Sequence, residues 1–148
     1  MISYLDARTR AFHHLQAAHQ ILTTSYPVLK EEKLLLVALN HLFLSFQDGL
    51  QILITAKHDV ASPSIPTMRK YVRKHSLSPL SLIAFQQIQE LVRLHKQSPV
   101  EFSKNDNFVI CSTNYELSVL TQEKLQEFLL ILEQFLNSID RIVLSEHL

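Results

Sequence analysis

Apolar residues recur along this chain at spacings of three and four, which is the period of an α-helix with one buried side. From about residue 3 to residue 26 this pattern predicts a first helix. Pro27 is expected to end it, because proline lacks the backbone N–H that a helix interior needs. The expected buried stripe of this helix is Leu5, Phe12, Leu15, Leu22 and Tyr26.

The most apolar part of the chain predicts a second helix, from about Glu31 to Lys57. At about 100° per residue, its apolar side chains form one continuous arc, and polar residues such as Asn40, Gln47 and Gln51 group on the opposite side. So wide an apolar face is typical of the central helix of a bundle. The arc consists of Leu35, Leu36, Leu39, Leu42, Phe43, Phe46, Leu50, Leu53 and Ile54.

The middle of the chain predicts a linker and two further helices. Residues 58–67 contain two prolines and read as a linker, and a short helix follows to about His75. Ser78 precedes Pro79, so a serine cap and a proline at the first helical position open a helix to about Gln97. Its expected buried stripe is Leu80, Ala84, Ile88, Leu91 and His95.

The last helix is predicted from about Thr121 nearly to the C-terminus, with a heptad-like seam. Before it, the short apolar runs 108–111 and 117–120 flank a turn-prone segment and predict a small β-hairpin. The sequence thus predicts an all-α, up-and-down bundle of four to five helices with this hairpin, in one domain of residues 1–148. The seam consists of Leu125, Phe128, Leu132, Phe135, Ile139 and Ile142.

Composition excludes several classes of function. The chain has one glycine, so it lacks the glycine-rich loops that cradle nucleotide phosphates, and we expect no nucleotide cofactor. One cysteine, Cys111, excludes an internal disulfide, and with no secretory leader in view we expect a cytoplasmic protein. The long apolar segment 34–54 includes Asp48, which would cost about 2.5–3.5 kcal/mol at a bilayer centre, so we expect no membrane association.

No metal-binding motif is evident either. His13, His14 and His19 lie close together in the first helix, but no pair has the spacing of four residues that places two ligands on one helical face. We therefore expect no metal and no other cofactor.

Formal charge is zero overall but uneven along the chain. Residues 57–104 carry eight basic and three acidic side chains, whereas residues 105–148 carry two basic and seven acidic ones. The densest basic cluster is the stretch RKYVRKH, residues 69–75, whose cations Arg69, Lys70, Arg73 and Lys74 project from one side of a helix. Acidic residues of the last helix or water would neutralise them; alternatively, they bind a polyanion such as RNA.

The chain resembles the HEPN (higher eukaryotes and prokaryotes nucleotide-binding) domains, which are small, often dimeric helical bundles, many of them metal-independent ribonucleases. Active members carry an arginine, four to six residues and a histidine, and Arg69–His75 and Arg141–His147 both match. The stretch ARTRAFHHLQAAHQIL and the apolar second helix are also similar. The block at residues 94–116 resembles one in small archaeal helical proteins.

This resemblance implies two hypotheses. In the first, the chain is an interaction module that dimerises through helix faces or binds a protein partner. In the second, it binds or cleaves RNA. Arg69 would then stabilise phosphate charge and His75 would handle the proton of an attacking 2′-hydroxyl, while Arg69, Lys70, Arg73 and Lys74 would contact phosphates. Two such sites would face each other across a dimer.

Overall fold

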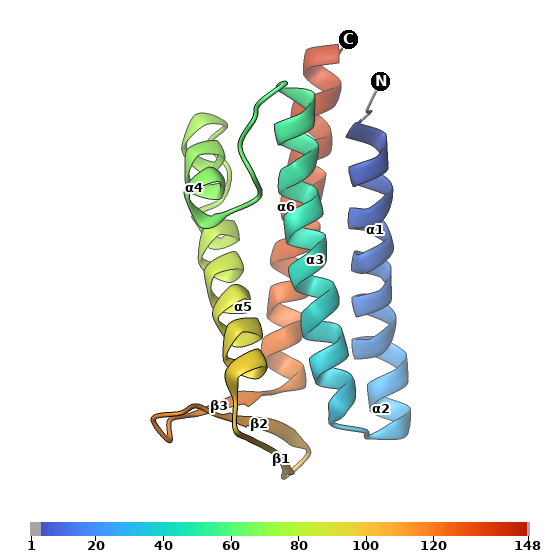
Figure 1. The fold of residues 1–148 in the computed structure, drawn as a ribbon. Helices are drawn as coiled ribbons and strands as arrows, with labels where there is room; N and C mark the ends of the chain where they lie inside the picture. Colours follow the sequence, from blue (N-terminus) through green and yellow to red (C-terminus); the bar gives the residue numbers. More distant parts are fainter. Residues whose placement is uncertain (1–3, 148) are drawn as a thin grey trace.

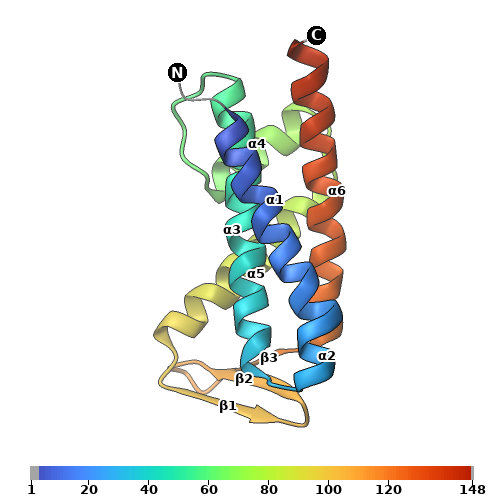
Figure 2. The same cartoon turned by 90° about the vertical axis from the view of Figure 1, so that its right-hand side faces the viewer.

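The computed structural model describes residues 4–147. Four long helices, α1 (Tyr4–Gln20), α3 (Lys33–Ala56), α5 (Pro79–Gln97) and α6 (Gln122–His147), form a bundle in which successive long helices run in opposite directions (Figure 1). A short helix, α4 (Ile65–Lys74), lies beside the start of α5. A small sheet lies across the end of the bundle that is remote from both termini (Figure 2).

Helix α3 is the centre of the bundle, as its apolar arc predicts. It packs against α1, α5 and α6. Phe46 illustrates this position, because its ring contacts Phe85 of α5 at a centroid distance of 5.9 Å and Phe135 of α6 at 5.4 Å. The fully or nearly fully buried apolar side chains of α3 are Leu35, Ala38, Leu39, Leu42, Phe46, Leu50, Ile52, Leu53 and Ile54.

Helix α1 packs on α3 mainly through small side chains, and the predicted stripe is wrong at Leu5, although Leu22 and Tyr26 are buried as predicted. Leu5 is 56% exposed, whereas Ala7, Ala11 and Ala18 are buried. The Ser45 hydroxyl of α3 donates a hydrogen bond of 2.7 Å to the Ala11 carbonyl, a contact that requires a close approach of the two helices. Apolar periodicity weights bulky residues, and so it missed a stripe whose main members are alanines.

The first helix also continues beyond its predicted end. A π-helical turn, η1 (Ile21–Ser25), leads directly into α2 (Tyr26–Leu29), which contains Pro27. The Tyr26 N–H bonds to the Ile21 carbonyl, and Pro27 has no N–H, so the Leu22 carbonyl needs a donor from elsewhere. Gln122 supplies it, with its Nε2 2.9 Å from the Leu22 oxygen. The predicted start at residue 3 lies outside the described residues.

The predicted hairpin is confirmed and belongs to a larger sheet. Strands β2 (Asn107–Cys111) and β3 (Leu117–Leu120) pair antiparallel, and β1 (Val100–Lys104) adds to the other edge of β2. The turn between β1 and β2 is Asn105-Asp106, both at positive φ, as a two-residue hairpin turn requires. The designation all-α therefore holds only in part: the bundle is helical, but one end carries three strands.

Helices α5 and α6 complete the core. The seam of α6 is buried within the chain from Leu125 to Ile139. In α5 the predicted stripe is wrong at Leu80, which is 53% exposed, because the helix turns Ser81 and Phe85 inward instead. Arg8 of α1 forms a two-pronged ion pair with Asp140 of α6, at 2.8 and 2.9 Å. Within residues 4–147, no helix combines the length and hydrophobicity that a membrane crossing requires.

Candidate functional site on helix α4

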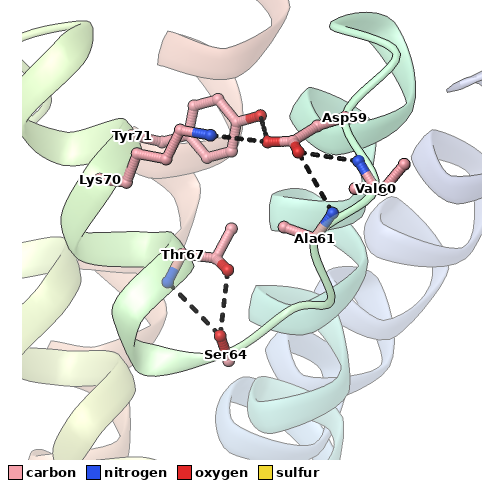
Figure 3. Close-up of polar contacts among 7 residues, drawn as sticks. All are labelled: Asp59, Val60, Ala61, Ser64, Thr67, Lys70 and Tyr71. Atoms are coloured by element: carbon pink, nitrogen blue, oxygen red, sulfur yellow. Dashed lines mark hydrogen bonds and ion pairs between the residues drawn. The ribbon is translucent and has the colours of Figure 1, made fainter.

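The basic cluster of the sequence lies on α4, and local chemistry fixes both ends of this helix. Ser64 is the N-cap, because its hydroxyl accepts from the Thr67 N–H at 3.4 Å and contacts the Thr67 hydroxyl at 3.0 Å (Figure 3). At the other end Ser76 adopts a left-handed conformation with φ 52°, and the Leu77 N–H bonds back to the Val72 carbonyl at 3.0 Å. This reversal buries Leu77 and leads the chain into α5.

The side chains of α4 divide into an inner and an outer face, as predicted. Thr67, Met68 and Tyr71 are buried against the bundle. The four cations of the cluster are exposed, and at about 100° per residue they occupy an arc of about 140°. We call this outer face the α4 cationic face; its members are Arg69, Lys70, Arg73 and Lys74.

Asp59, in the loop before α4, organises one side of this face (Figure 3). Its Oδ2 accepts from the Tyr71 hydroxyl at 2.7 Å and from Lys70 Nζ at 2.9 Å, while its Oδ1 accepts from the Val60 and Ala61 N–H groups. These bonds, that from Tyr71 foremost, hold the pKa of Asp59 far below its usual range. Burial and this carboxylate raise the pKa of Tyr71. The loop and α4 are thus joined by one ionised carboxylate.

The other three cations have no such partner. Among the described residues, Arg69, Arg73 and Lys74 form no ion pair and no side-chain hydrogen bond. The acidic residues of α6 do not reach them; instead, Glu146 pairs with Lys57 at the end of α3. Like charges one helical turn apart repel, so this face gains stability when an anion binds it.

His75 points away from the α4 cationic face. Its ring is half-buried and stacks on Tyr71, with a centroid distance of 5.9 Å and an interplanar angle of 11°. Its Nε2 is buried and has no hydrogen-bond partner among the described residues. Burial, helped by nearby Lys57, lowers the pKa of His75, so the ring is neutral near pH 7. No hydrogen bond joins it to Arg69, which lies about 120° away around the helix axis.

The second arginine–histidine match lies on α6. Arg141 is exposed and donates to the Ser138 hydroxyl at 3.2 Å. The side chain of His147 lies outside the described part of the chain. The structure therefore places Arg141 but gives no geometry for this pair.

A histidine cluster between α1 and α3 was missed by sequence reasoning. His14 and His41 face each other with their Nδ1 atoms 2.9 Å apart, and His14 Nε2 lies 4.0 Å from a carboxylate oxygen of Asp48. Burial is the main cause that lowers the pKa of both rings. Within the described residues, no three His, Cys, Asp or Glu side chains are placed to hold a metal ion. The sequence does hold one indication of this cluster, because His41 and Asp48 are polar residues within an otherwise apolar helix.

No protein-family model, curated protein or solved structure matches the chain. No relative therefore assigns a function to the α4 cationic face or to the histidine cluster.

Proposed function

We propose that this chain is a HEPN-like interaction module that pairs with a second copy of itself through helix α5. The observation that carries the proposal is a partly exposed apolar stripe along one side of α5, with exposed Gln87 inside it. Leu80 is 53% and Ile83 46% exposed, and half-buried Leu91 and Leu94 continue the same side toward the C-terminal end of the helix. These four residues fall within about 80° of one another on the helix.

The C-terminal half of this stripe borders a groove. The groove has a volume of about 480 Å³ and lies between α5, β3 and α6. Its apolar walls are Leu91, Leu94, Val119 and Phe128, with Gln86, Gln87, Glu90, Ser118 and Lys124 around them. A concave apolar surface beside convex apolar side chains is suited to a helix-in-groove contact.

The two halves of the stripe complement each other in a two-fold dimer. Leu80 and Leu91 are eleven residues apart, about 16 Å along the helix axis. An antiparallel pairing of two α5 helices brings Leu80 and Ile83 of each copy to the groove of the other. Such an isologous contact buries both halves at once and closes without leaving a free surface.

The heptad-like seam of α6 is not available to a partner. Leu125, Leu132 and Ile139 are fully buried within one chain. A partner therefore has to use another surface, and α5 presents exposed Leu80 and Ile83 on the same side as partly buried Leu91 and Leu94.

Light scattering coupled to size exclusion tests this proposal. We expect a dimeric mass for the wild type and a monomeric mass for the double variant Leu80→Lys/Ile83→Lys. Val37→Lys is the matched control, because Val37 is 44% exposed on α3 and lies outside the stripe. A wild-type monomer at all concentrations and salt levels would overturn the proposal, and so would a double variant that stays dimeric.

A second candidate function is RNA binding through the α4 cationic face. Its supporting observation is that Arg69, Arg73 and Lys74 are exposed without an ionic partner among the described residues. The inward ring of His75 favours binding over cleavage, because a proton-transfer group has to reach the substrate. In the cleaving form, Arg69 and His75 would be the catalytic pair.

Two measurements distinguish RNA binding from RNA cleavage. In fluorescence anisotropy, Arg69→Ala/Arg73→Ala should weaken binding of a single-stranded RNA, and the slope of log affinity against log salt should become shallower. Lys30→Ala/Lys33→Ala, which removes two cations outside the cluster, is the control. In a cleavage assay, equal rates for wild type, Arg69→Ala and His75→Ala, or no cleavage by any of them, would exclude the catalytic form.

A further inference from the structure

A cavity separate from α4 and from the α5 stripe lies between the start of α5 and the middle of α6. Its volume is about 530 Å³, within the range of small-molecule sites in proteins. Its lining residues are Leu77, Ser78, Ser81, Gln134, Phe135, Asn137, Ser138 and Arg141.

The lining offers donors and a positive charge but no carboxylate. Arg141 is its charged member, and its one hydrogen bond to a described residue goes to the Ser138 hydroxyl. A guanidinium has five N–H groups, so most of those of Arg141 are available to a ligand. The Ser138 hydroxyl accepts from Arg141 and therefore keeps its own proton for donation.

Ser81 offers the cavity a further donor. The residue is only 2% exposed and lines the cavity, yet its hydroxyl makes no hydrogen bond to any described residue. The hydroxyl oxygen is not sealed off, since His75 Nε2 alone is both buried and unpartnered among the described side chains, so the hydroxyl opens into the cavity and can donate there. A bound anion would accept its proton. Ser81 also lies in the first turn of α5, where the helix dipole favours negative charge.

We propose that this cavity binds a small organic phosphate monoester. Arg141, Ser81 and Ser138 would donate to the phosphate oxygens, and the organic part would pack against the buried side chains of Leu77 and Phe135. Arginine recognises phosphate in many proteins through charge-assisted hydrogen bonds. The proposal is independent of dimerisation and of RNA binding by α4.

Isothermal titration with phenyl phosphate and inorganic phosphate tests it. We expect phenyl phosphate to bind the wild type with a dissociation constant of about 1 mM or tighter, and inorganic phosphate to bind more weakly because it lacks the apolar part. Arg141→Gln should weaken phenyl phosphate by about tenfold or more. Arg93→Gln is the matched control, since Arg93 is an exposed arginine of α5 that pairs with Glu90.

Ser81→Ala separates ligand binding from folding. The Ser81 hydroxyl has no partner among the described residues, so its removal should leave the thermal midpoint equal or higher while phenyl phosphate binding weakens. The proposal is overturned if phenyl phosphate does not bind, if it binds no better than inorganic phosphate, or if Arg141→Gln and Ser81→Ala bind it as the wild type does. Single-stranded RNA that binds through Arg141 while phenyl phosphate does not would assign the cavity to an RNA surface instead.

Discussion

Gly49 of α3 lies directly against Leu136 of α6. A Cβ atom at position 49 would be 2.6 Å from Leu136 Cδ2 and 3.0 Å from Phe135 Cε2, and Leu136 is fully buried. The one glycine of the sequence therefore serves to bring the central helix and the last helix together.

Gly49→Ala should destabilise the protein even though alanine is the better helix former. Overpacking a tight core costs about 1–3 kcal/mol, and the helix propensity of alanine returns about 1 kcal/mol. We expect a net loss of up to about 2 kcal/mol in urea unfolding. Ser138→Ala, on the half-buried side of α6, is the comparison. A variant more stable than the wild type would show that α3 and α6 are further apart.

Leu39→Ala or Phe46→Ala should lower the free energy of unfolding by about 2–5 kcal/mol, because each opens a cavity in a packed core. Both side chains are essentially fully buried in the central helix. Val37→Ala, at a 44% exposed position of the same helix, should change it by less than about 1 kcal/mol. Equal effects at positions 37 and 39 would contradict the orientation of α3.

Asp59→Asn should destabilise the protein at neutral pH, because the ionised carboxylate accepts from both Tyr71 and Lys70. The pKa of Asp59 is lowered in the folded state. The stabilisation that ionised Asp59 gives to the fold is therefore complete above the pKa of the unfolded state, about 4. It is lost as the pH falls through the lower pKa of the folded state. Denaturant midpoints of the wild type and the variant should converge in acid. Asp6→Asn, at an exposed position of α1, should match the wild type at neutral pH.

The pair His14 and His41 should make the fold sensitive to mild acid. Both pKa values are lowered, mainly by burial, so below about pH 6.5 the unfolded chain binds more protons than the folded one. Stability should therefore fall as pH drops from about 7.5 to about 5.5. His41→Gln should flatten this dependence, as measured by urea midpoints across that range. An unchanged slope in His41→Gln and in His14→Gln would refute the assignment.

The helices could be predicted because their signals are local. Ser78-Pro79 marks the start of α5, and the apolar arc identifies α3 as the centre. The rotations of α1 and α5 could not be predicted in the same way. Bulky residues at positions 5 and 80 suggested the buried side, but packing favoured Ala7, Ala11 and Ser81, whose small side chains allow close contact.

The candidate site was predictable in part for the same reason. The exposed cations of α4 follow from helical spacing, whereas Asp59 and its bond to Tyr71 depend on the path of a loop. His41 lies 27 residues from His14, and Arg141 lies 60 residues from Ser81, so tertiary structure alone brings each pair to one place. Strand β1 has a local signal in the sequence, because Asn105-Asp106 is a typical two-residue hairpin turn between β1 and β2.

The use of the one glycine inside a helix leaves the turns to bulkier residues. Lys30, His58, Ser76 and Tyr115 all adopt positive φ between 52° and 64°. A left-handed conformation costs such residues roughly 1–2 kcal/mol each. Glycine substitutions at these four positions are consequently expected to stabilise the protein without altering any helix.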